Sequence, residues 1–177
     1  MQLIDLQRLK QYKLTHMNAI CTTFQKTHLK IARVVDGDGL IATNLFNNKE
    51  EEIRLLGIDA PELKKCRKLI QDEKETHLAG EFLMHLGKLS YQYLIKIASI
   101  DEPITLVMEQ DNHTDLYGRT LAYVYLNNGR CLNEILIKEG YAKPFDKYYC
   151  NKLAEYQVLH VKAKIERKGL YSIVKTF

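Results

Sequence analysis

The chain has 177 residues, of which 46% are hydrophobic, so it can bury a sizeable core within one domain. This composition is that of a globular protein and excludes a disordered polyelectrolyte. The formal net charge of +4 permits a polyanionic partner without requiring one. The four cysteines include no Cys-x-x-Cys pair, which argues against a zinc ribbon, and their number is too small for a disulfide-dense scaffold. We expect free, mostly buried thiols, with a Cys66–Cys150 bridge left open.

Residues 1–28 differ in character from the rest of the chain. Leu3, Leu6 and Leu9 permit a short helix with one apolar edge, and the segment contains no glycine or proline. We expect a helical or frayed N-terminal extension over 1–28, followed by one domain over 29–177. The N-terminus has no apolar core of the kind that a secretory signal needs, and no run of 18 apolar residues predicts a membrane span. These features favour a cytoplasmic protein, with secretion open if the N-terminus is truncated.

Short strands and tight turns follow, which predicts a mainly β domain with helices, an α+β fold. Asp36-Gly37-Asp38-Gly39 predicts a hairpin turn between the first two strands, and three consecutive strands joined in this way indicate a meander or a small barrel. Apolar residues at spacings of three and four predict a long helix, with Thr76 as its N-cap. We expect five strands at 29–35, 40–45, 53–58, 104–109 and 119–126, three helices at 77–98, 132–139 and 152–168, and a partly helical loop at 63–75.

Arg54 is the first residue whose position indicates a catalytic or binding site. It lies inside the apolar strand Ile53-Arg54-Leu55-Leu56-Gly57-Ile58. Burying an unpaired charge there would destabilise the fold by several kcal/mol, as an order of magnitude. Arg54 therefore either has a fixed carboxylate partner or binds an anion. Acids suited to a hard cation and a second arginine lie in the fragments 36–39, 59–62 and 115–119. The combination indicates a metal-dependent phosphodiesterase acting on nucleic acid.

The turn at 36–39 is not an EF-hand loop, because the glycine and glutamate that such a loop requires are replaced by Ile41 and Asn47. Asp36 is expected to bond the backbone of its own turn. Asp38 is the better candidate ligand, and Asp59, at the end of the third strand, is the second acid. If strands two and three are antiparallel, the two acids meet at one rim. Two carboxylates with a backbone carbonyl suit Ca²⁺.

Three motifs in order resemble the staphylococcal nuclease-like, or thermonuclease, family. They are the Asp-Gly-Asp turn at 36–38, the strand end Arg-Leu-Leu-Gly-Ile-Asp-Ala-Pro-Glu at 54–62, and Tyr-Gly-Arg at 117–119. The resemblance covers residues 29–172 approximately. It implies an OB-fold, a five-stranded barrel with three helices. It also implies a calcium-dependent endonuclease that hydrolyses DNA and RNA and leaves 3′-phosphate ends.

The resemblance also implies the role of each site residue. Asp38, Asp59 and the Ala60 carbonyl would ligate Ca²⁺, and Glu62 would act through a water at the metal and activate the attacking water. Arg54 and Arg119 would bind the scissile phosphate. Tyr117 would bind the terminal phosphate of the nucleotide, with Tyr148 or Tyr149 as the stacking residue. These nine positions make up the expected site. The expected partners are DNA and RNA, without a membrane, and a monomer is favoured.

A second reading stays open beside the enzyme. A domain of the same fold could be catalytically silent and bind nucleic acid or a peptide partner, but such relatives typically lose the acids and arginines that this chain retains. A purely structural barrel would require Arg54 and Arg119 to be paired internally. Zinc ligation by Cys66 with His77 is disfavoured, because no second pair of ligands completes a site.

Overall fold

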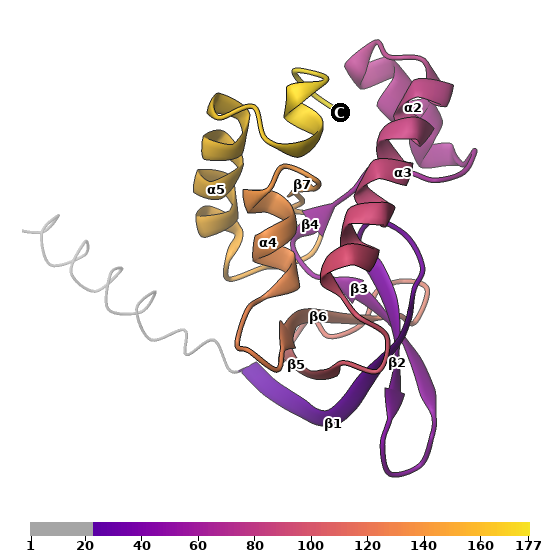
Figure 1. Cartoon of the computed structure of the whole chain (residues 1–177), viewed down its shortest axis with the longest axis vertical. Coiled ribbons are helices and arrows are strands. Elements are labelled where there is room, and N and C mark those ends of the chain that lie inside the picture. The colour runs from indigo at the N-terminus through magenta and orange to yellow at the C-terminus, as the bar shows by residue number, and fades with distance from the viewer. Residues whose placement is uncertain (1–22) are drawn as a thin grey trace, which may run out of the picture.

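The computed structural model describes residues 23–177 and consists of a five-stranded barrel with helices gathered at one end (Figure 1). The barrel is closed in the order β1-β2-β3-β6-β5. Its strands are β1 (Thr23–Val34), β2 (Gly39–Asn44), β3 (Glu50–Leu55), β5 (Pro103–Glu109) and β6 (Thr120–Leu126). The predicted five-stranded barrel is therefore confirmed.

Strand β1 is longer than predicted, because it begins at Thr23 instead of Leu29. It pairs with both β2 and β5, and its register shifts between Lys26 and Leu29 and again between Ile31 and Arg33. Such bulges bend a strand, which lets β1 close the barrel against two neighbours. The predicted extension over 1–28 lies largely outside the described residues, as does Cys21.

The pairing of β3 with β6 is parallel, whereas the other pairs of the barrel are antiparallel. Arg54 on β3 lies opposite Leu121 on β6, so the strand that carries Arg54 runs beside the strand that Arg119 precedes. A small second sheet continues from this region. It consists of β4 (Ile58–Asp59) and β7 (Lys143–Pro144), paired antiparallel.

Four α-helices occur among residues 23–177, one more than predicted. They are α2 (Arg67–Thr76), α3 (Gly80–Ile97), α4 (Leu132–Lys138) and α5 (Leu153–Ile165), followed by the 3₁₀ helix η1 (Gly169–Ser172). The additional helix α2 occupies the stretch that was expected to be a partly helical loop. The Cys66 side chain accepts a hydrogen bond from the Leu69 N–H at 3.4 Å and caps it. Helix α5 ends at Ile165, three residues before the predicted end.

The prediction that Thr76 is an N-cap is wrong. Thr76 is the last residue of α2, and its hydroxyl donates to the Asp72 carbonyl at 2.7 Å. His77 then adopts a left-handed conformation with φ 58°, and α3 begins only at Gly80. A threonine before an apolar periodic stretch has the same sequence pattern in both situations, and only the preceding helix distinguishes them.

Asn133 ties helix α4 to the barrel. This side chain is fully buried, and its amide donates to the carbonyls of Leu56 at 2.9 Å and Ala122 at 3.1 Å. Its oxygen accepts from the Val124 N–H at 3.0 Å. One asparagine therefore satisfies backbone groups on β6 and just beyond β3, which holds the parallel pair together.

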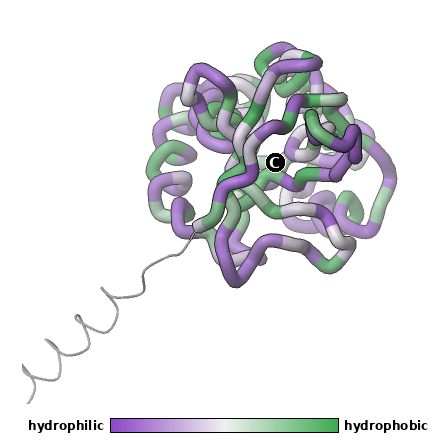
Figure 2. The backbone as a smooth tube through the Cα atoms, turned by 90° about the horizontal axis from the view of Figure 1, so that it is seen from below, coloured by the Kyte–Doolittle hydropathy of each residue, from purple (hydrophilic) through white to green (hydrophobic). Residues whose placement is uncertain are grey.

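Within residues 23–177, Cys66, Cys131 and Cys150 are free, and Cys66 is exposed while the other two are buried. The Cys66–Cys150 bridge that the sequence left open is therefore absent. Hydrophilic and hydrophobic stretches alternate along the tube in Figure 2. No helix of the described residues is long and apolar enough to cross a membrane.

Candidate functional site

The turn between β1 and β2 brings Asp38 to the strand end at residue 59. Asp36 accepts a hydrogen bond from the Asp38 N–H at 3.1 Å, which confirms its predicted role within the turn. Gly37 packs so closely that a Cβ there would lie 2.6 Å from the Ala60 Cβ and 2.9 Å from the Ser90 Cβ. The absence of a side chain at Gly37 thus lets the turn approach residue 60. Asp38 uses this proximity, since its Oδ2 accepts from the Ala60 N–H at 2.7 Å.

Arg54 joins the two predicted acids. Its guanidinium pairs with Asp38 Oδ1 and with Asp59 Oδ1, the latter at 3.0 Å, and it also donates to the Ile58 carbonyl at 3.3 Å. Antiparallel pairing of β2 with β3 places Arg54 opposite Gly39, as expected. Asp38 and Asp59 therefore share a rim as predicted. The buried arginine has fixed carboxylate partners in this structure.

Lys68, on the first turn of α2, contacts Asp59 from the side opposite Arg54 and also contacts Glu62. Its Nζ lies 3.1 Å from Asp59 Oδ2 and 3.1 Å from Glu62 Oε1. It also donates to the Ala60 carbonyl at 3.4 Å and lies 3.5 Å from Asp72 Oδ2. Both carboxylate oxygens of Asp59 thus face a cation, Arg54 on one side and Lys68 on the other.

The charges of this cluster depend strongly on burial. Burial raises the pKa of Asp38 to about 8, although the neighbouring Arg54 guanidinium opposes the shift. Burial would lower the pKa of Arg54 and of Lys68, but the carboxylates beside them raise both above their ordinary values. The two cations consequently stay charged.

A second turn positions Arg119. Asp115, whose side chain is fully buried, accepts hydrogen bonds from the backbone N–H groups of Tyr117 and Arg119, both at 2.9 Å. Its other oxygen accepts from Arg119 Nε at 2.8 Å. Burial alone would raise the pKa of Asp115, but these hydrogen bonds from Arg119 and Tyr117 bring it below its ordinary value. Asp115 therefore orients the arginine. It does not join Asp38 and Asp59 as a third acid, as the sequence had allowed.

A cavity of about 820 Å³ connects these groups. It is lined by residues of both turns, of α2 and of the segment after β7, including Arg54, Asp59, Glu62, Lys68, Tyr117, Arg119 and Tyr148. Tyr117 is 82% exposed, and the Arg119 guanidinium lies 5.7 Å from the centre of its ring. Tyr149 does not line this cavity, and its hydroxyl donates to Asn151 at 2.9 Å. Of the two candidate stacking tyrosines, the structure brings only Tyr148 to the site.

The donor set fits a hard cation. Among residues 23–177 no three His, Cys, Asp or Glu side chains are already arranged to hold a metal ion. The Lys68 ammonium nevertheless shows that Asp59, the Ala60 carbonyl and Glu62 converge on one positively charged point, at 3.1–3.4 Å. All three are oxygen donors, the kind that Ca²⁺ prefers. Asp38 lies beside them but turns both its oxygens to Arg54 and to the Ala60 N–H.

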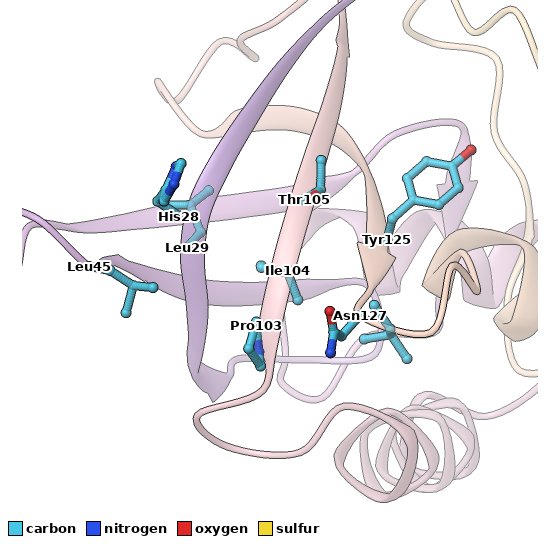
Figure 3. Close-up of a pocket in the computed structure, with 9 residues that line it drawn as sticks. His28, Leu29, Leu45, Pro103, Ile104, Thr105, Tyr125 and Asn127 are labelled. Carbon is cyan, nitrogen blue, oxygen red and sulfur yellow. The ribbon is translucent and has the colours of Figure 1, made fainter.

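A smaller cavity of about 230 Å³ lies on β1, β5 and β6 (Figure 3). Its lining contains His28 and Tyr125 but no carboxylate, lysine or arginine. It shares no residue with the larger cavity. This second cavity therefore lacks the groups that charged-substrate chemistry requires, and the larger cavity is the candidate site.

Sequence reasoning missed Lys68 and Asp72, which belong to a stretch that reads as a charged surface segment. The only indication of a site residue was the density of cations in Lys64-Lys65-Cys66-Arg67-Lys68. This density did not show which of these side chains faces the cavity. The structure shows that α2 lines the cavity through six residues, namely Cys66 at its cap, Arg67, Lys68, Gln71, Asp72 and Glu75.

Comparison with known proteins places the sequence among nucleases. A family model described as Staphylococcal nuclease homologue matches residues 52–173, more than half of the chain. Endonuclease YncB of Bacillus subtilis (strain 168) is 27% identical over 173 residues, which cover 89% of this chain and 74% of that protein. The SPbeta prophage-derived endonuclease YokF of the same organism is 30% identical, over 79% of this chain and 42% of that protein. The thermonuclease of Staphylococcus hyicus is 31% identical, over 68% of this chain and 59% of that protein.

Proposed function

The chain belongs to the staphylococcal nuclease family, and we propose that it is a calcium-dependent endonuclease that hydrolyses DNA and RNA. The observation that carries this proposal is the convergence, on one cavity, of the acids Asp59 and Glu62 with Arg54 and Arg119. Arg54 lies on β3 and Arg119 directly precedes β6, and the register of this parallel pair, with Arg54 opposite Leu121, places both arginines at one rim.

The reaction we propose is the attack of a water on the phosphorus of a phosphodiester. Glu62 is the proposed general base and takes a proton from the attacking water. The bond from phosphorus to the 5′ oxygen breaks, and this oxygen takes a proton from solvent, which leaves a 3′-phosphate and a 5′-hydroxyl. Asp38, Asp59 and the Ala60 carbonyl would hold Ca²⁺, with Glu62 bound through a water. The bound ion supplies positive charge to the phosphate oxygens and to the attacking water.

The arginines have separate tasks in this proposal. Arg119 is held by Asp115 at 2.8 Å and opens onto the cavity, so its guanidinium can bind the equatorial phosphate oxygens without first being ordered. Arg54 balances Asp38 and Asp59 in the structure, and it is the second group proposed to bind the phosphate. Tyr117 is proposed to bind a terminal phosphate and Tyr148 to stack on a base.

The rival function is a catalytically silent module that binds nucleic acid or a peptide. Both arginines are paired internally, which is the condition that a purely structural barrel required and which is also compatible with a silent module. The retention of Asp38, Asp59 and Glu62 beside them supports the enzyme instead, because a module that only binds a polyanion gains nothing from three carboxylates at its binding surface.

The test is the release of acid-soluble nucleotides from heat-denatured DNA, with calcium and then with EGTA. We expect calcium-dependent release. General-base help is worth about 10²–10⁴-fold and transition-state arginines about 10³–10⁵-fold, so Arg119→Ala should lose at least as much activity as Glu62→Gln. Arg33→Ala is the matched control, since Arg33 pairs with Glu50 on the exposed barrel surface at 2.9 Å.

Two outcomes would contradict the proposal. Full activity in Arg54→Ala or Arg119→Ala would overturn the mechanism. No release with or without calcium, while the protein still binds DNA, would favour the silent module. The product ends are tested separately: the fragments should accept a 5′-phosphate from polynucleotide kinase without prior dephosphorylation, because their 5′ ends are hydroxyls.

A further inference from the structure

Lys68 contacts three of the four groups that are proposed to hold calcium, namely Asp59, the Ala60 carbonyl and Glu62, but not Asp38. Its Nζ lies 3.1 Å from Asp59 Oδ2, 3.1 Å from Glu62 Oε1 and 3.4 Å from the Ala60 carbonyl. The Asp59 side chain is only 2% exposed, so this ammonium is not a passing surface neighbour. An ammonium has three N–H donors, and the Lys68 ammonium lies near four oxygens, those of Asp59, Glu62, Ala60 and Asp72.

The fold directs Lys68 to this position. Cys66 caps α2 and fixes where the helix begins, which sets the direction of the side chains on its first turn. Lys68 lies on that first turn, and Asp72 lies one turn further along at 3.5 Å. The ammonium thus has one set of partners in the acid cluster and one partner on its own helix.

A calcium ion and this ammonium exclude each other. Calcium takes oxygen ligands at about 2.3–2.6 Å, so an ion held by Asp59 and the Ala60 carbonyl, with a water toward Glu62, would take the space that Nζ fills. The two positive charges would also repel each other at such a distance in a partly buried site.

We infer that Lys68 is an internal counter-cation that holds the calcium ligands together before the metal binds and has to leave for calcium to enter. The inference rests on the proposed function, because it assumes the calcium ligands named there. In the metal-free protein Lys68 balances Asp59 and Glu62, whose carboxylates would otherwise repel each other. When calcium enters, Asp72 remains as the partner of the displaced ammonium. Calcium affinity is therefore set by a competition within the protein.

The experiment is calcium titration by calorimetry on metal-free wild type and Lys68→Met, with no substrate present. We expect Lys68→Met to bind calcium at least tenfold more tightly, equivalent to about 1.4 kcal/mol. Its metal-free form should melt at a lower temperature than wild type, and saturating calcium should raise its Tm by more. The matched control is Lys147→Met, which removes a cation that lines the same cavity but lies against the Tyr148 ring at 5.6 Å. Its calcium affinity should stay within threefold of wild type, roughly the effect of a distant screened charge.

The outcomes separate this inference from the proposed function. If wild type binds calcium and Lys68→Met binds it equally or more weakly, Lys68 is merely structural and the inference is wrong while the function stands. If neither protein binds calcium, the proposed cofactor is wrong and the inference falls with it. Lys68→Gln is the second variant if Lys68→Met does not fold, because its amide can still hydrogen-bond Asp59 without carrying a charge. The same tightening is expected for it.

Discussion

Replacing Asn133 by alanine tests whether one buried amide holds helix α4 against the barrel. The substitution removes the two hydrogen bonds that the Asn133 amide donates, to Leu56 and Ala122, and the one that its oxygen accepts from Val124. The Ala122 carbonyl keeps a partner, since it also accepts from the Leu56 N–H at 2.9 Å. The Leu56 carbonyl and the Val124 N–H lose the partner that Asn133 provided.

The expected loss follows from these two groups. A buried backbone group left without its hydrogen bond costs about 1–3 kcal/mol, and the missing side-chain atoms add a small cavity. Together these effects predict a loss of about 3–5 kcal/mol in the free energy of unfolding. At about 2–4 °C per kcal/mol for a domain of this size, the Tm should fall by roughly 6–20 °C.

Thermal unfolding followed by circular dichroism and calorimetry measures this loss. Asn128→Ala is the matched control, because Asn128 is exposed and its side chain accepts only a local hydrogen bond, from the Arg130 N–H at 3.1 Å. That control should stay within about 1 kcal/mol of wild type. A fall in Tm of less than about 3 °C for Asn133→Ala would refute the reasoning, since it would mean that the Leu56 carbonyl and the Val124 N–H find other partners at little cost.

Two further predictions concern the turns of the site. The pKa of Asp115 is lowered in the folded protein, so its carboxylate binds a proton more readily in the unfolded chain. The ionised Asp115 therefore stabilises the fold above about pH 4, and this stabilisation is lost as the pH falls through the pKa of the folded state. Asp115→Asn should therefore lower the Tm near neutral pH, and the gap to wild type should narrow in acid; parallel Tm curves would contradict this. Gly37→Ala should lose about 1–3 kcal/mol by overpacking against Ala60 and also weaken calcium binding. Gly129→Ala, where a Cβ meets no atom within 4 Å, should leave calcium binding unchanged, as measured by urea unfolding and calorimetry.

Much of the barrel could be predicted because its strands alternate and its turns contain their own signals. The turn at 36–39 combines glycine with self-bonding aspartate, and the structure confirms both the turn and the antiparallel pairing that follows it. Asp38 and Asp59 could be placed at one rim for that reason. The parallel pairing of β3 with β6 could not be derived from periodicity alone, since strand patterns do not state which distant strand lies alongside.

The features that were missed depend on contacts between distant parts of the chain. Lys68 resembles any exposed lysine of a charged segment, and only the position of α2 turns it toward Asp59. Thr76 has the pattern of an N-cap, yet α2 extends to it and uses its hydroxyl inside the helix. Asp115 has the pattern of a metal ligand, but three hydrogen bonds from its own turn engage it. In each case the residue type indicated what the side chain could do, but the sequence did not show which group it contacts.

The parallel pairing of β3 with β6 joins two parts of the proposed site that are synthesised one after the other. During synthesis the acids, Arg54 and Lys68 all emerge with residues 36–72, whereas Arg119 follows with β6. Until β6 has been synthesised the barrel cannot close, because β3 lacks the neighbour with which it pairs in parallel. A nascent chain therefore lacks one of the two guanidinium groups proposed to bind the phosphate.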